Sequence, residues 1–159
     1  NLNRKQEIMN RHFTATGYVV INNSILLHFH PKVKMWLPPG GHIELNEDPN
    51  QAVIREIFEE TSIEVDIFSD STNFEFNYPK SIIPPEHILI EDINDPVEGF
   101  HQHIDLIYYC KPTKIPDVLP KEWIEIDQNQ LINNYQNTII ISPDVRKIGL
   151  SAIEKITKL

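Results

Sequence analysis

The chain has 159 residues, of which 40% are hydrophobic and 23% are charged, a balance typical of folded globular proteins and unlike disordered or fibrous ones. This length suits one hydrophobic core, so we expect a single domain over residues 1–159. The formal net charge of −9 repels polyanions and argues against a nucleic-acid duplex or an anionic membrane as a partner.

The apolar segments and the cysteine content favour a cytoplasmic protein. No stretch approaches the roughly 18–20 apolar residues needed to cross a bilayer, and residues 1–13 are polar where a signal peptide would be apolar. The single cysteine, Cys110, ends the apolar run that begins at Ile107, and we expect it to be a buried free thiol.

The first elements in chain order are predicted to be strands. Residues 13–21 and 25–29 are rich in β-branched and aromatic side chains, and Asn22-Asn23 between them favours a turn, so they predict a β-hairpin. The following segment, Trp36-Leu37-Pro38-Pro39-Gly40-Gly41, is expected to be a loop, because proline removes backbone donors and glycine permits tight geometry.

A helix is predicted from Asp48-Pro49 to about Thr61, with Asp48 as the N-cap and Pro49 tolerated in the first turn. Residues 63–68 then read as a strand. Further strands are expected at residues 73–78, 87–90, 103–110 and 123–126. Ser142-Pro143 opens an amphipathic C-terminal helix, in which Val145, Ile148, Ile153 and Ile156 recur on one face.

The predicted helix at residues 49–61 carries an acidic face. At about 100° per residue, Glu56, Glu59 and Glu60 share one arc. Carboxylates at these spacings repel each other unless a cation lies between them, and oxygen donors suit Mg²⁺ or Mn²⁺. A solvated helix surface is the alternative reading of three glutamates alone. The opposite side is expected to be core and consists of Val53, Ile54, Ile57 and Phe58.

The acidic residues belong to a longer pattern. Residues 41–63 read G-HIELN-E-DPNQAVI-R-E-I-F-E-E-T-S-I and resemble the Nudix box, G-x5-E-x7-R-E-U-x-E-E-x-G-U with U aliphatic. Every defined position matches except Ser62, where the box has glycine, and the preceding residues 36–41 resemble the usual lead-in. The resemblance implies an α/β fold, an α/β/α sandwich with a mixed β-sheet between helices.

The resemblance also implies residue roles. Glu56, Glu59 and Glu60 would bind Mg²⁺ (or Mn²⁺), with the Gly40 carbonyl as a further ligand. Arg55 and Glu47 would support the catalytic glutamates, Arg55 through a bidentate, charge-assisted pair. The expected activity is metal-dependent hydrolysis of a pyrophosphate (phosphoanhydride) bond in a small phosphorylated substrate, such as a nucleoside diphosphate linked to another moiety, with alkaline pH favoured.

The departure at Ser62 affects backbone geometry. A residue just past a helix end usually takes the left-handed conformation, which costs a side-chain-bearing residue about 1 kcal/mol or more relative to glycine. We therefore expect a positive φ at Ser62 and a small loss of stability, with no loss of metal ligands.

Three other functions remain open to comparison. A catalytically silent Nudix-fold module could bind a nucleotide or sugar phosphate, but the box acids are intact. An isomerase of the isopentenyl diphosphate type would use an extra cysteine, whereas Cys110 is predicted to be buried. A transcription regulator would need an added DNA-binding domain. The box determines neither the substrate, the general base nor the oligomeric state, a homodimer being one option.

Outside the box, the segment around residues 98–105 is the densest in reactive side chains. Glu98 follows the turn-prone Asn94-Asp95-Pro96 and is a candidate to approach the metal or the attacking water. On a strand, His101, His103 and Asp105 share one face. We expect His101 and His103, with Trp36 before the box, to contact substrate. Zinc binding by the two histidines and Asp105 lacks an evident fourth ligand.

Overall fold

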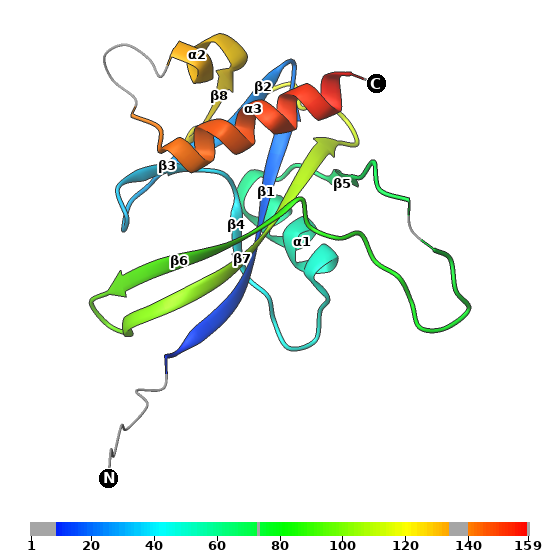
Figure 1. The fold of residues 1–159 in the computed structure, drawn as a ribbon. Coiled ribbons are helices and arrows are strands. Elements are labelled where there is room, and N and C mark those ends of the chain that lie inside the picture. The colour runs from blue at the N-terminus through cyan, green and yellow to red at the C-terminus, as the bar shows by residue number, and fades with distance from the viewer. Residues whose placement is uncertain (1–8, 73, 134–139, 159) are drawn as a thin grey trace.

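The protein is described here from a computed structural model that covers residues 9–72, 74–133 and 140–158. One mixed sheet contains the eight strands of these residues (Figure 1). The strands are β1 (Arg11–Ile21), β2 (Ser24–His30), β3 (Met35–Leu37), β4 (Gly40–His42), β5 (Val65–Phe68), β6 (His87–Asp95), β7 (Gly99–Pro112) and β8 (Trp123–Asp127). The helices are α1 (Pro49–Thr61), α2 (Gln128–Asn133) and α3 (Pro143–Thr157).

Strand β1 is central to the sheet. It pairs in parallel with β7 and antiparallel with β2 and β4, so the sheet is mixed. Because strand side chains alternate between faces, Ala15 and Val19 pack in the α1 cluster, whereas Tyr18 and Val20 pack in the α3 cluster. Helices α1 and α3 thus cover opposite faces, which confirms the predicted α/β/α sandwich.

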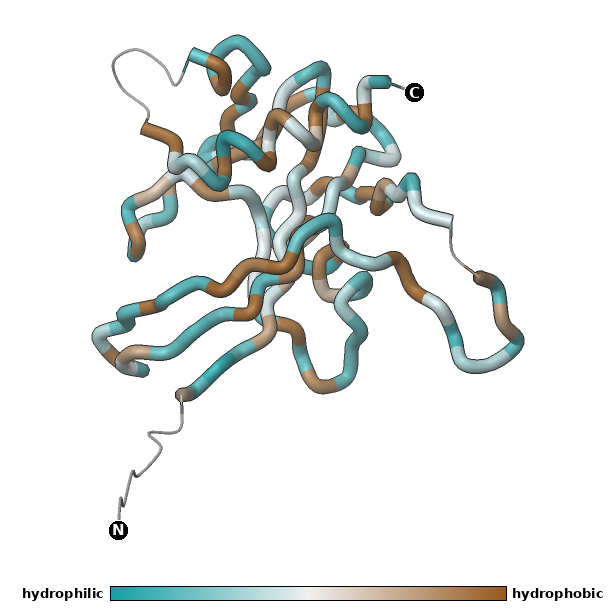
Figure 2. Tube along the Cα trace, viewed as in Figure 1, coloured by the Kyte–Doolittle hydropathy of each residue, from teal (hydrophilic) through white to brown (hydrophobic). Residues whose placement is uncertain are grey.

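The predicted hairpin and both predicted helices are confirmed. Asn22 and Asn23 have positive φ angles of 48° and 65°, the geometry of a tight turn that matches strand twist. The C-terminal helix α3 alternates apolar and polar residues along its length (Figure 2). Cys110 is fully buried, as expected. No helix within the described parts of the chain is long and apolar enough to span a membrane.

Helix α1 begins with a capping box. The Asp48 side chain accepts a hydrogen bond from the Gln51 backbone N–H, and the Gln51 side chain accepts one from that of Asp48. The core prediction for this helix was partly wrong, because Val53 and Ile57 are buried while Ile54 and Phe58 are 39% and 50% exposed. Ile54 and Phe58 are four residues apart and therefore adjacent on the side of the helix that the sheet does not cover.

Two predictions of local structure were wrong. Residues 36–41 were expected to form a loop, yet β3 and β4 flank Pro38-Pro39. Gly40 pairs with Thr16 of β1, and a Cβ on Gly40 would lie 2.6 Å from the Ala15 carbonyl oxygen, so only glycine allows this approach.

The strand expected at residues 73–78 is the second error, since residues 74–78 are not in a strand. Phe74 and Tyr78 are 79% and 89% exposed. Aromatic residues favour strands only where a neighbouring strand and a buried face are available, and this segment projects from the sheet (Figure 1). Strands β6 and β7 run longer than predicted and meet at a turn in which Gly99 has a φ of 76°.

Candidate active site

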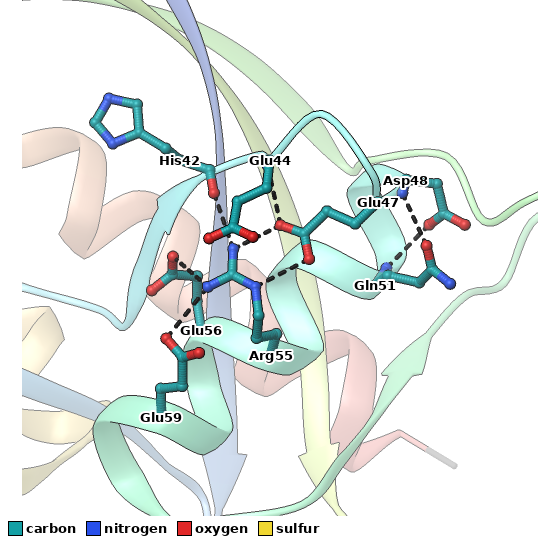
Figure 3. Close-up of polar contacts among 8 residues, drawn as sticks. All are labelled: His42, Glu44, Glu47, Asp48, Gln51, Arg55, Glu56 and Glu59. Atoms are coloured by element: carbon teal, nitrogen blue, oxygen red, sulfur yellow. Dashed lines mark hydrogen bonds and ion pairs between the residues drawn. The ribbon is translucent and has the colours of Figure 1, made fainter.

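Arg55 lies at the centre of the acidic face of α1 (Figure 3). A guanidinium carries five N–H donors, and here each has an acceptor. Nε donates a hydrogen bond to one Glu47 carboxylate oxygen at 2.9 Å, and Nη2 donates one to the other oxygen at 2.6 Å. Nη1 donates to Glu56 at 2.9 Å and to Glu59 at 3.2 Å, and Nη2 also donates to the His42 carbonyl at 3.0 Å. One side chain therefore orients three carboxylates and strand β4.

Glu47 connects this network to the loop before α1. Its carboxylate receives Arg55 as a bidentate pair and also accepts a hydrogen bond from the Glu44 backbone N–H at 3.0 Å. The hydrogen bond from Arg55 lowers the pKa of the Glu47 carboxyl, so this group is ionised at neutral pH. Arg55 thus makes its bidentate pair with Glu47, whereas it reaches the metal-ligand candidates Glu56 and Glu59 through one hydrogen bond each.

The Glu56 carboxylate lies directly against Gly41. A Cβ on Gly41 would lie 2.5 Å from the Glu56 carboxyl carbon, closer than any side chain allows. Glycine at the start of the box thus lets β4 pass over the acidic face of α1, and the Glu56 carboxylate remains held between this strand and Arg55.

Glu60 is in a more enclosed environment than Glu59. Its carboxylate accepts a hydrogen bond from the Gly40 backbone N–H at 3.2 Å. Burial, with smaller repulsions from Glu56 and Glu59, raises the pKa of Glu60 to about 7, although the hydrogen bond from Gly40 lowers it. The glutamates therefore form a site with excess negative charge. Carboxylate oxygens are the donors that Mg²⁺ and Mn²⁺ prefer.

Two residues beside Glu60 were not identified from the sequence. His28 lies with its Nε2 4.0 Å from a Glu60 carboxylate oxygen, and its ring stacks on Trp123 with centroids 4.2 Å apart. The Trp123 Nε1–H donates to the Glu60 backbone carbonyl at 3.1 Å. These residues belong to β2 and β8, and only the pairing of those strands brings them to the end of α1.

Ser62 has the predicted backbone geometry. Its φ and ψ are 60° and 19°, in the left-handed region, and its backbone N–H donates to the Phe58 carbonyl at 2.8 Å. The residue therefore ends α1 in the way that glycine ends many helices, but with a side chain attached.

The candidate residues outside the box lie in two places. Trp36 is on β3, partly buried against the α3 core cluster and 5.6 Å from the Phe29 ring between centroids. Glu98 lies in the β6–β7 turn, with its carboxylate 3.8 Å from His101 Nε2. His101 and His103 do share one strand face, as predicted, and their ring centroids are 5.1 Å apart. Their role in substrate binding stays a prediction.

Two further histidines, His12 and His42, join His101 and His103, and we call these four the histidine cluster. His12 is the register partner of His103 in the parallel β1–β7 pair, and His42 is on β4. From the sequence, the alternation of side chains along β7 predicts only that His101 and His103 lie on the same face. Asp105 does not join them, because its carboxylate accepts hydrogen bonds from the Thr14 and Thr16 hydroxyls at 2.9 Å each.

Comparisons with known proteins agree with this geometry. A family model described as the NUDIX domain matches residues 11–141. A NUDIX family hydrolase from Clostridium perfringens is 30% identical, has a TM-score of 0.75, and is matched over 93% of this chain and 99% of its own. The comparison with curated proteins found no match.

Two less similar structures share the fold. An Ap4A hydrolase from C. elegans is 18% identical, with a TM-score of 0.53 and coverage of 95% of this chain and 98% of its own. An ADP-ribose pyrophosphatase from Streptococcus suis is 11% identical, with a TM-score of 0.52 and coverage of 93% and 92%. The match over most of the chain, together with the box on α1, shows that this protein belongs to the NUDIX family.

Proposed function

We propose that the protein hydrolyses a phosphoanhydride bond in a small phosphorylated substrate, a nucleoside diphosphate linked to another moiety, with Mg²⁺ or Mn²⁺ as the cofactor. The observation that carries the proposal is the arginine-centred arrangement, in which Arg55 orients Glu56 and Glu59 beside Glu60. Family membership supports the reaction class.

A divalent cation fits this donor set. The carboxylates of Glu47, Glu56 and Glu59 hydrogen-bond to one guanidinium, and Glu60 lies beside Glu56 and Glu59, so the site carries a net charge of about −3 when all four carboxylates are ionised. Burial is the main cause of the raised pKa of Glu60, and repulsion from Glu56 and Glu59 adds to it. Glu56, Glu59 and Glu60 would hold the cation, and the Gly40 carbonyl is a candidate for a further oxygen ligand. Bound Mg²⁺ or Mn²⁺ supplies neutralisation of the phosphate oxygens and a more acidic water.

Arg55 and Glu47 position the carboxylates in this proposal. Arg55 holds Glu56 and Glu59 in fixed positions, and Glu47 fixes Arg55 from the loop. In the reaction, a water oxygen bonds to phosphorus while the bridging P–O bond breaks, and the leaving phosphate keeps the bridging oxygen. The water proton passes to a carboxylate, for which Glu56 and a carboxylate outside the box are both candidates.

A substrate panel tests the proposal. Nucleoside diphosphate sugars, ADP-ribose, Ap4A and nucleoside triphosphates would be incubated with Mg²⁺, with release of phosphate, pyrophosphate or nucleotide as the readout. The names of the two fold relatives motivate including ADP-ribose and Ap4A. We expect turnover of at least one substrate and its loss in excess chelator. Full turnover in chelator would refute metal dependence.

A catalytically silent module remains the second candidate. It would bind a nucleotide or sugar phosphate, measurable by calorimetry, with no turnover of any panel member by the intact chain. Glu56→Gln and Glu59→Gln provide the control for contamination. A trace of contaminating hydrolase would give the same activity in preparations of the parent protein and of both variants.

A further inference from the structure

The histidine cluster lies on the sheet face opposite α1. His42 pairs in register with Thr14, and Thr14, His103 and Asp105 all project to the face that α3 covers, away from the Glu56 carboxylate. Figure 3 shows the same separation at β4, where the His42 carbonyl points toward Arg55 and its imidazole points away from the glutamates. The cluster is thus a separate group of side chains, located toward the hydrophilic outer ends of β1 and β7 (Figure 2).

The ring nitrogens are close enough to share one ion. One ligand nitrogen from each of His12, His101 and His103 lies within 4.8 Å of the others. His12 Nδ1 and His42 Nε2 are 3.2 Å apart. Tetrahedral zinc with bonds of about 2.0–2.1 Å requires nitrogen atoms about 3.4 Å apart, so small side-chain rotations would complete such a site.

The hydrogen bonding of His101 leaves a nitrogen free for a ligand. Its Nδ1 donates to the Gly99 carbonyl at 3.0 Å, so Nδ1 carries the proton and Nε2 carries the lone pair. Metal-binding histidines typically donate their second ring N–H to a carbonyl in this way, which fixes both tautomer and ring orientation. The Glu98 carboxylate, 3.8 Å from Nε2, adds negative charge beside the same nitrogen.

His103 supplies an independent indication. Its Nε2 is buried and has no hydrogen-bond partner among the described residues, an uncommon state for a polar atom. A hydrogen-bonded structural cluster would satisfy this nitrogen, whereas a bound ion would use it as a ligand.

We propose that His12, His101 and His103, with His42 as the fourth ligand, bind a nitrogen-preferring transition-metal ion of the Zn²⁺ class. Imidazole donors select zinc, cobalt, nickel and copper ions, whereas the carboxylates of α1 suit Mg²⁺ and Mn²⁺. The two sites therefore differ in ligand chemistry as well as in position. Three elements, β1, β4 and β7, contribute to the histidine site, so bound metal would link strands that are distant in sequence.

The test uses Co²⁺ as a spectroscopic probe and Zn²⁺ for calorimetry, on the metal-stripped full chain. The background is the Glu56→Gln/Glu59→Gln variant, in which the carboxylate site is weakened. We expect one Zn²⁺ per chain with micromolar or tighter affinity, and a visible Co²⁺ absorption band typical of a four-coordinate nitrogen site.

Two variants of the cluster and one matched control complete the design. In the same background, His12→Asn and His103→Gln should each weaken binding at least tenfold and remove the Co²⁺ band, while His30→Asn, a histidine outside the cluster, should leave both unchanged. Circular dichroism and thermal melts establish that each variant is folded. Absence of stoichiometric binding to the background protein, or an unchanged Co²⁺ band in folded His12→Asn and His103→Gln, would overturn the proposal.

Discussion

The Ser62→Gly variant offers the sharpest test of how the box geometry affects stability. Ser62 ends α1 with a φ of 60°, and its side chain is exposed. The left-handed conformation costs a residue with a Cβ about 1–2 kcal/mol. Glycine removes this cost but also raises the conformational entropy of the unfolded chain, which lowers the free energy of unfolding by about 0.4–1 kcal/mol. The free energy of unfolding should therefore rise by about 0.5–1 kcal/mol.

The expected change is measurable by thermal and urea denaturation. For a domain of this size, 1 kcal/mol corresponds to about 2–4 °C in Tm, so Ser62→Gly should melt about 1–4 °C higher than the parent. Ser62→Ala is the matched control, because it removes the hydroxyl but keeps the Cβ and its strain. If Ser62→Gly is no more stable than Ser62→Ala, the backbone at this position does not carry the proposed cost.

Four further predictions concern the acidic site and the core. Glu59→Gln or Glu60→Gln should lower kcat by roughly 10²-fold or more with the fold preserved, as measured by steady-state kinetics across Mg²⁺ concentrations. A fully active variant would show that the substituted residue does not bind the metal. Arg55→Lys keeps the charge but cannot make the five hydrogen bonds, so kcat should fall at least about tenfold, and unchanged kinetics would contradict its orienting role. Burial raises the pKa of the Cys110 thiol, so a thiol reagent should label it at least about 10²-fold more slowly in the native protein than in urea, and rapid native labelling would show that the thiol is accessible. Burial raises the pKa of Tyr108 from 10.0 to about 12, so its contribution to the free energy of unfolding is fully present below pH 10 and is lost as the pH rises toward 12. Tyr108→Phe should make stability fall less steeply over this range in alkaline denaturation. A pH profile identical to that of the parent protein would refute the assignment to Tyr108.

Local physical chemistry made much of the site predictable. The Asp48 cap, the carboxylates at spacings of three and four on one helix, and the left-handed Ser62 depend on residues only a few positions apart, where backbone geometry sets which groups meet. The Asn22-Asn23 turn was predictable for the same reason. The pattern of the box added the arginine and the glutamate that pairs with it.

Strand pairing decided what the sequence alone could not. Residues 74–78 have strand-like side chains, but no strand forms there because strand formation depends on a neighbouring edge. His28 lies beside Glu60 only because β2 pairs with β8 and packs over the end of α1. His12 and His103 meet through the parallel register of β1 and β7, and a shift of one residue would place one of them on the opposite face. Such registers follow from the packing of the whole core, so the acidic site was predictable from sequence, whereas the histidine cluster required the tertiary structure.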